Sequence, residues 1–114
     1  PVRVGAVILG FVGIFLTVAV PEELIFRGIL QNGLGKDFLR MTKLDAQTAQ
    51  WTALLVASII FGLFHWNNGH DPLYVIFATV AGLFYGWAYI KGDSLWAPAL
   101  AHTLVDLIWA FAFK

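Results

Sequence analysis

The chain has 114 residues, of which 60% are hydrophobic and only 12% are charged, and its formal net charge is zero. Its mean hydropathy of +0.78 excludes an ordinary soluble domain, in which about a quarter of the residues are charged. The neutral balance gives no electrostatic basis for binding nucleic acid, and the absence of cysteine excludes disulfides and thiolate chemistry. The length corresponds to a single domain, residues 1–114, and the proline at position 1 predicts that this domain is a piece of a longer chain.

The first apolar stretch covers residues 4–34 and is too long for a simple membrane span. Pro21 lies near its middle and removes one backbone donor, so we expect a kink or an interruption of the helix there. Residues 36–45 form a polar connection in which basic and apolar residues alternate, a pattern that favours a short interfacial helix.

Three further helices are expected beyond this connection. They cover residues 46–66, 72–90 and 95–113. Asp45 is a candidate N-cap for the first of them, and the Asp71-Pro72 pair suits the N-cap and first position of the next. Asp93 or Ser94 is the candidate cap of the last helix. These polar residues divide the apolar sequence into separate helices.

The apolar stretches each reach the roughly 18 residues that a membrane-spanning helix requires. A buried helical bundle of a soluble protein is the alternative, which the composition disfavours. Gly82 and Gly86, four positions apart in the third helix, would allow another helix to approach closely. The sequence therefore predicts an all-α, polytopic membrane helix bundle with about four transmembrane helices.

Glu22, Glu23 and Arg27 interrupt the first apolar stretch. Ionisable groups are costly in lipid and are tolerated mainly where they pair or line a functional cavity. In a helix, Glu23 and Arg27 are i,i+4 neighbours, whereas Glu22 points about 100° away from Glu23. We therefore expect Arg27 to neutralise Glu23 in a structural pair and Glu22 to face something else. The plainer interpretation is a charge network that only fixes helix packing.

Two later helices bring further titratable groups into apolar surroundings. His65 follows Phe61 by four positions, and Asp106 follows His102 by four, so that each pair shares one helix face. Taken alone, His65 fits an interfacial residue bonded to backbone, and His102 with Asp106 fits a self-contained buried pair. Polar groups on three helices together favour a functional site. His70 lies in a turn cluster and is expected to be an exposed loop histidine.

The three patterns occur in order as Glu-Glu-x-x-x-Arg, Phe-x-x-x-His and His-x-x-x-Asp. In this order they resemble the motifs of the CPBP family of intramembrane proteases. That family includes the Ras-converting-type CAAX prenyl proteases and bacterial Abi-type relatives linked to bacteriocin processing and self-immunity. The resemblance covers residues 21–106, and the three ordered motifs together are specific. It implies an endopeptidase acting on a membrane-associated substrate, with prenylated CAAX-type proteins as one class.

The resemblance also implies roles for individual residues. Glu22 would activate a water as general base, and His65 would help to hold that water. His102 and Asp106 would stabilise the oxyanion, and the Glu23–Arg27 pair would give structural support. Amide hydrolysis needs these parts, because a base must deprotonate water and donors must face the developing negative charge.

Two versions of this mechanism remain open. The family is commonly described as metalloproteases, and Glu22, His65 and His102 would form a plausible zinc set. We favour a metal-free glutamate mechanism, because the sequence lacks the His-Glu-x-x-His helix of zincins. Asp106 stands where the family often has asparagine, and an ionised aspartate cannot donate a hydrogen bond to an oxyanion. It must be protonated, orient His102 instead, or bind a metal.

The main alternative function is a non-catalytic membrane protein of the same fold that binds a peptide or confers bacteriocin self-immunity. A transporter with Glu22 and Asp106 as a proton relay is more distant. The expected partners are membrane lipid and a membrane-associated peptide or protein, and the expected location is a bacterial cell membrane, crossed several times. The distribution of lysine and arginine favours the side with residues 36–45 and 91–94 as cytoplasmic.

Depth in the membrane poses one difficulty. His65 lies about 15 residues beyond Trp51 in its helix, whereas His102 lies about seven beyond Leu95, so parallel helices would place them at unequal depths. A tilted last helix, or a second helix that begins well outside the lipid, would bring the two histidines level.

Overall fold

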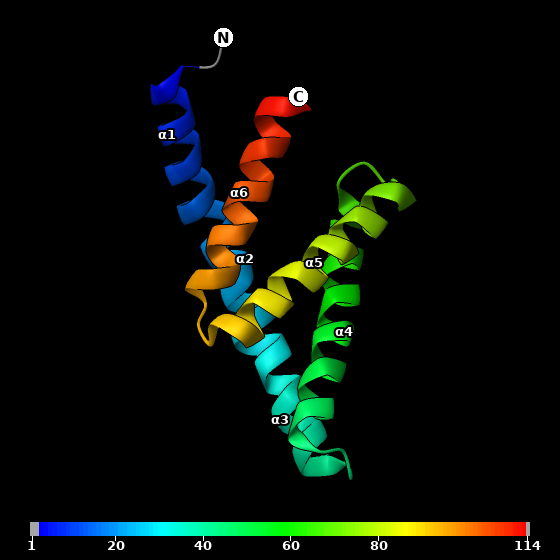
Figure 1. Cartoon of the computed structure of the whole chain (residues 1–114). Coiled ribbons are helices and arrows are strands. Elements are labelled where there is room, and N and C mark those ends of the chain that lie inside the picture. The colour runs from blue at the N-terminus through cyan, green and yellow to red at the C-terminus, as the bar shows by residue number, and fades with distance from the viewer. Residues whose placement is uncertain (1–2, 114) are drawn as a thin grey trace.

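The computed structural model describes residues 3–113, which are helical over nearly their whole length (Figure 1). A continuous helical rod, Val4–Met41, opens the chain. The rod consists of α1 (Val4–Ile14), the π-helical η1 (Phe15–Ala19), α2 (Val20–Glu23), the π-helical η2 (Leu24–Gln31) and α3 (Asn32–Met41). It is followed by α4 (Ala46–Phe64), the 3₁₀ turn η3 (His65–Asn67), α5 (Pro72–Gly92) and α6 (Trp96–Ala112). Three helical units are long and apolar enough to cross a membrane, and α6 is a shorter apolar helix, so the predicted all-α membrane bundle is confirmed.

The rod passes through Pro21 without an interruption, so of the two outcomes predicted there, a kink or an interruption, the interruption is wrong. The π-helical segment η1 ends immediately before α2, and the backbone N–H of Val20 bonds to the carbonyl of Phe15, five residues back. A wider turn relieves the clash between a proline ring and the carbonyl four residues before it, which is the usual cause of a break. The helix therefore absorbs Pro21 by changing its hydrogen-bond register.

The predicted polar connection is also shorter than expected. Residues 36–41 form the end of α3 rather than a separate interfacial helix, and an ion pair of 3.1 Å between Asp37 and Arg40 lies on its surface. The helix ends where Thr42 becomes extended, so residues 42–45 alone link the rod to α4.

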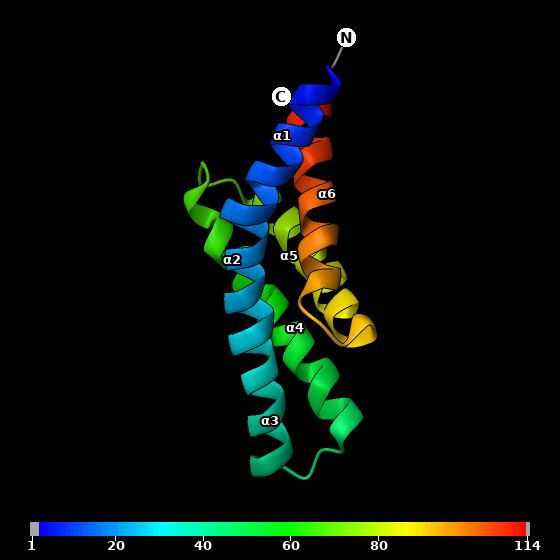
Figure 2. The ribbon, with the colours of Figure 1, turned by 90° about the vertical axis from the view of Figure 1, so that its left-hand side faces the viewer.

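The helices are staggered along the rod. α1 and α6 lie side by side at one end, α3 and α4 at the other, and α5 crosses between them (Figures 1 and 2). Because α5 is steeply inclined, α6 begins partway along the molecule rather than level with the start of α4 (Figure 1). With this stagger, His65 at the end of α4 and His102 in the second turn of α6 line the same cavity, which resolves the unequal depths expected for the two histidines.

Two of the predicted helix caps are present. The Asp45 side chain accepts a hydrogen bond from the Thr48 backbone N–H at 2.7 Å and opens α4. That hydrogen bond holds the pKa of the exposed Asp45 carboxyl below its ordinary value. Asp71 accepts from the N–H of Leu73 at 2.9 Å, with Pro72 as the first residue of α5. Both caps satisfy backbone donors that a helix start leaves free.

The prediction that Asp93 or Ser94 caps the last helix was wrong. α6 begins at Trp96 with Leu95 as its N-cap, and no side chain caps it. Asp93 instead ends α5 in the left-handed conformation, with φ of 50°. Aspartate tolerates this conformation better than most residues, which explains why the position closes one helix rather than opening the next.

Close packing between α4 and α5 depends on the predicted small residues. A Cβ added at Gly82 would lie 3.1 Å from the Phe61 ring, and one at Gly86 would overlap the Leu54 side chain. Phe61 and Leu54 are themselves buried in α4. The two glycines therefore allow the close helix approach that the sequence predicts.

The buried core is narrow and lies where the rod, α4 and α5 meet. Phe26, Phe61, Ala78 and Tyr85 form its apolar centre. By contrast, α1 has no buried residue, and Leu9 on it is 75% exposed. An apolar outer surface around a small polar-lined core is what a helix bundle in lipid presents.

Candidate active site

A buried polar stripe runs along the rod. Glu23, Arg27 and Gln31 recur every four residues and are 0%, 0% and 2% exposed. The Arg27 Nε lies 3.3 Å from Glu23 Oε2, so the expected ion pair is present, although it is an electrostatic contact without hydrogen-bond geometry. Arg27 Nη2 donates to the carbonyl of Gly82 at 2.8 Å. Arg27 thus links the rod to α5 at Gly82, where no side chain covers the backbone carbonyl.

Aromatic rings enclose the remainder of the arginine. Its guanidinium carbon lies 5.0 Å from the centre of the Phe61 ring and 5.9 Å from the centre of the Tyr85 ring. A guanidinium over aromatic faces gains electrostatic attraction that grows where water is excluded. Arg27 is therefore a structural centre of the bundle rather than a group open to a ligand.

His102 on α6 is held between two carboxylates. Its Nδ1 lies 2.8 Å from Glu23 Oε1, and its Nε2 lies 3.3 Å from Asp106 Oδ2. Ionised carboxylates only accept hydrogen bonds, so an imidazole that serves both must donate from both nitrogens and carry a positive charge. The Asp106 contact was expected from i,i+4 spacing. The Glu23 contact was not, because nothing in a sequence relates residues 79 positions apart.

The carboxylate of Glu23 therefore has two cationic neighbours, Arg27 on the rod and His102 on α6. This is a larger role than the simple pair expected for it. With Asp106 included, two carboxylates and two cations are balanced within the same polar cluster. Such a balance is what allows charged groups to persist in an apolar interior.

Glu22 and His65 face each other beside this cluster. The Glu22 Oε1 lies 3.8 Å from His65 Nε2, and the two side chains are 25% and 13% exposed. The other ring nitrogen of His65, Nδ1, lies 2.7 Å from the carbonyl oxygen of Phe61. Because a carbonyl only accepts, Nδ1 is the donor in this contact, and in the neutral ring Nε2 presents a lone pair toward Glu22. Glu22 thus points away from the Glu23–Arg27 pair, as its helical position predicts.

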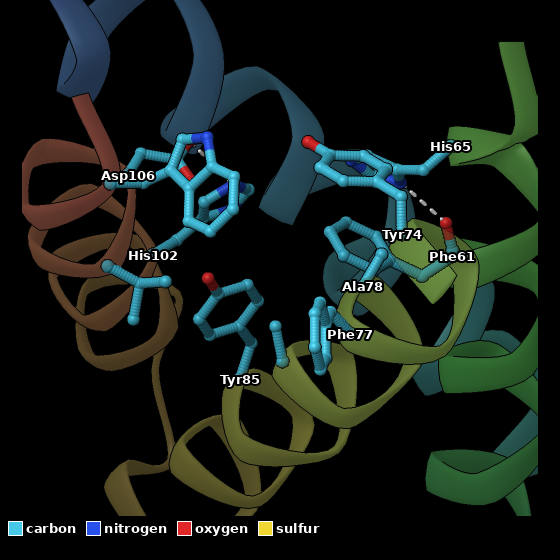
Figure 3. A pocket seen from close by; sticks show the side chains of 11 residues that line it. Phe61, His65, Tyr74, Phe77, Ala78, Tyr85, His102 and Asp106 are labelled. Carbon is cyan, nitrogen blue, oxygen red and sulfur yellow. Dashed lines mark hydrogen bonds and ion pairs between the residues drawn. The ribbon is translucent and has the colours of Figure 1, made fainter. Parts of the chain in front are cut away.

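A cavity of about 110 Å³ lies between α4, α5 and α6 (Figure 3). His65 lines it from one side, and His102 and Asp106 line it from the other. Aromatic rings form much of the remaining wall, which includes Phe61, Tyr74, Phe77, Tyr85 and Trp109. The structure therefore brings residues of the second and third sequence motifs to one cavity. Glu22, from the first motif, lies next to the cavity residue His65.

Tyr85 is a cavity residue that none of the sequence motifs indicated. Its ring stacks on His102 with centroids 4.5 Å apart and an interplanar angle of 11°. Tyr85 is 2% exposed, and in the sequence it is one aromatic residue among many in an apolar helix. Only the packing of α5 against α6 gives it a place in the site. His70, in contrast, is exposed in the turn before α5, as expected.

The proposed zinc ligands do not form a metal site in this arrangement. Among residues 3–113, no three His, Asp or Glu side chains are placed so that they could hold one metal ion. Both ring nitrogens of His102 already face carboxylates, so neither offers a free lone pair to a metal shared with Glu22 and His65. The donor set fits acid–base chemistry better than metal coordination.

Comparison with known proteins gives the family. Residues 4–108 match the family model described as "Type II CAAX prenyl endopeptidase Rce1-like". "Uncharacterized protein YpbD" of Bacillus subtilis is 31% identical over 99 residues, which are 85% of this chain and 43% of the relative. "Putative membrane peptidase YdiL" of the same organism is 29% identical over 85 residues, which are 75% of this chain and 29% of the relative. No solved structure matches the chain significantly.

The chain spans less than half the length of the curated relatives it matches. Its apolar helices, together with these relatives, make it a multi-pass bacterial membrane protein. The family match extends over all three sequence motifs and most of the helices described above. The chain belongs to the Rce1-like family of type II CAAX prenyl endopeptidases.

Proposed function

We propose that this protein is an intramembrane endopeptidase that hydrolyses a peptide bond of a membrane-associated substrate by means of a glutamate-activated water. Residues 1–114 would form its peptidase core. The observation that carries the proposal is the Glu22–His65 pair, at 3.8 Å, next to a cavity lined by His65, His102 and Asp106. The family description supports a lipid-anchored CAAX-type peptide as the substrate.

The distance between Glu22 and His65 suits a water held by both. Two atoms 3.8 Å apart are too far apart for a good hydrogen bond with each other, yet a third atom beside them can lie about 2.8 Å from each. Both Glu22 Oε1 and His65 Nε2 are acceptors, so such a water would donate one proton to each. Its oxygen lone pairs would then face away from the pair, toward a substrate carbonyl.

The reaction follows from these positions. Glu22 takes a proton from the water while the water oxygen bonds to the carbonyl carbon. This step leaves a negative charge on the carbonyl oxygen. The tetrahedral species then collapses as the carbon–nitrogen bond breaks, and the proton on Glu22 passes to the leaving amine. The products are a carboxylic acid and an amine, and one water is consumed. The positive charge of His102 next to the cavity favours the negatively charged intermediate.

Glu22→Gln tests the proposal. Glutamine preserves the size of the side chain but cannot accept a proton from water, so we expect cleavage to fall by at least about 100-fold, within the range attributed to general base catalysis. The assay is cleavage of a lipid-anchored reporter peptide by the purified protein in liposomes. Reporter binding and the unfolding temperature should stay at the wild-type level.

Asp37→Asn is the matched control, because it removes the same charge from an exposed position on α3. It should cleave the reporter as fast as the wild-type protein. Full activity in Glu22→Gln would refute the general-base role. Reporter binding without cleavage by the wild-type protein would instead favour a peptide-binding or immunity protein.

A further inference from the structure

The polar groups around the cavity leave one catalytic requirement unmet. An oxyanion needs a hydrogen-bond donor placed at the cavity, but both nitrogens of His102 face carboxylates. The protonated nitrogen of His65 faces the Phe61 carbonyl, and an ionised Asp106 can only accept. The donor for the substrate carbonyl must therefore come from a different group at the cavity.

We propose that the Tyr85 hydroxyl donates this hydrogen bond to the carbonyl oxygen of the scissile peptide bond. The inference rests on the proposed peptidase function and adds a catalytic residue to it. Tyr85 lines the cavity, and Figure 3 shows its hydroxyl directed to the side where His102 and Asp106 lie. No hydrogen bond of this hydroxyl is found among residues 3–113, so it can donate to a substrate.

The ring that carries this hydroxyl is fixed on several sides. It stacks on His102 at 4.5 Å and meets the edge of Phe61 at 6.0 Å, and the Arg27 guanidinium lies 5.9 Å from its centre. Only 2% of the residue is exposed. A donor stabilises an oxyanion best when it needs no reorganisation as charge develops, and this packing holds the phenol in place.

Two other side chains of the cavity could donate, and both are less constrained. Tyr74 is only partly buried, and its ring lies 5.9 Å from His65 in a tilted arrangement. Trp109 is 41% exposed. Tyr85 stacks on His102, whereas the rings of Tyr74 and Trp109 pair with each other, and Tyr74 also with His65. The geometry therefore favours Tyr85.

Tyr85→Phe is the decisive variant, because it keeps the ring and its stacking and removes only the hydroxyl. We expect kcat for the lipid-anchored reporter to fall by about 100-fold, as for loss of one oxyanion donor, with KM and the unfolding temperature unchanged. Tyr89→Phe is the matched control, since it makes the same change one turn further along α5 and outside the cavity. It should leave kcat at the wild-type value.

A substrate variant gives a second measurement. Sulfur accepts hydrogen bonds poorly, so replacing the scissile carbonyl oxygen by sulfur should lower kcat. This reduction should be larger in the wild-type protein than in the Tyr85→Phe variant, which has already lost the donor. An equal penalty in both proteins would contradict direct donation, as would wild-type kcat in Tyr85→Phe. A larger loss in Tyr74→Phe would move the donor to Tyr74. If Glu22→Gln is inactive while Tyr85→Phe is fully active, this inference alone fails; if Glu22→Gln is fully active, the peptidase mechanism fails with it.

Discussion

The buried pair of Glu23 and Arg27 allows a quantitative test of how the core is held together. Arg27→Met keeps much of the apolar length of the side chain and removes its charge. It would break the 3.3 Å ion pair with Glu23 and the 2.8 Å hydrogen bond to the Gly82 carbonyl, at a position with 0% exposure. Loss of one partner of a buried pair costs about 3–5 kcal/mol. Because His102 remains 2.8 Å from Glu23 and offsets part of its charge, we expect a loss near the middle of that range.

Adding Glu23→Gln to this variant should restore part of the loss. The double variant leaves no unpaired carboxylate beside the missing arginine, and the glutamine oxygen can still accept from His102 Nδ1. The double variant still lacks the hydrogen bond from the charged Arg27 side chain to the Gly82 carbonyl, so it should remain less stable than the wild-type protein by about 1.5–3 kcal/mol. The free energy of unfolding of the double variant should therefore lie above that of Arg27→Met alone.

The assay is equilibrium unfolding in mixed detergent micelles for the wild-type protein, both single variants and the double variant. The exposed pair Asp37 and Arg40 provides the control, since its contact of 3.1 Å is similar but the side chains are 54% and 76% exposed. Arg40→Met should change the free energy of unfolding by less than about 1 kcal/mol. Losses that simply add in the Glu23/Arg27 double variant would mean that the two charges are not energetically coupled, and the reasoning would be refuted.

Two further predictions follow from the site and from the helix packing. Asp106→Asn should retain substantial activity, because the amide oxygen can still accept from His102, whereas Asp106→Ala and His102→Ala should not; activity lost in Asp106→Asn and restored by added zinc would overturn the metal-free mechanism. Gly62→Ala should destabilise the protein by about 1–3 kcal/mol, because its Cβ would overlap the Thr79 side chain. Gly33→Ala, with no atom within 4 Å of the added Cβ, should be neutral or stabilising in the same unfolding assay, and equal effects of the two substitutions would contradict the packing argument.

Hydrophobic pattern and spacing were enough to predict the membrane helices and most of the local pairings. The Glu23–Arg27 and His102–Asp106 contacts lie four residues apart on single helices, and helix geometry alone brings such residues together. The cap at Asp45 also follows from local chemistry. Interactions within one or two helical turns can be predicted because the backbone conformation already determines them.

Contacts that depend on how helices cross could not be predicted in this way. The hydrogen bond from His102 to Glu23 and the stacking of Tyr85 on His102 arise from the inclination of α5 and the position of α6, which no local pattern encodes. Pro21 shows a second limit. Its usual effect is a break, but a change to π-helical register just before it costs little enough for the helix to continue.

The length of the opening rod has a consequence for the lipid around the protein. The long axis of the structure measures 55 Å, whereas the hydrocarbon core of a bilayer is about 30 Å thick. Tilting alone would have to exceed the roughly 40° found for membrane helices, so the hydrophobic mismatch must also be met by kinking, by local thickening of the bilayer or by letting one end emerge. The charged end of α3, with Lys36 and Arg40 exposed, is suited to the headgroup layer. Acyl-chain length will therefore set the depth of the Glu22–His65 pair relative to the lipid-anchored substrate that we propose.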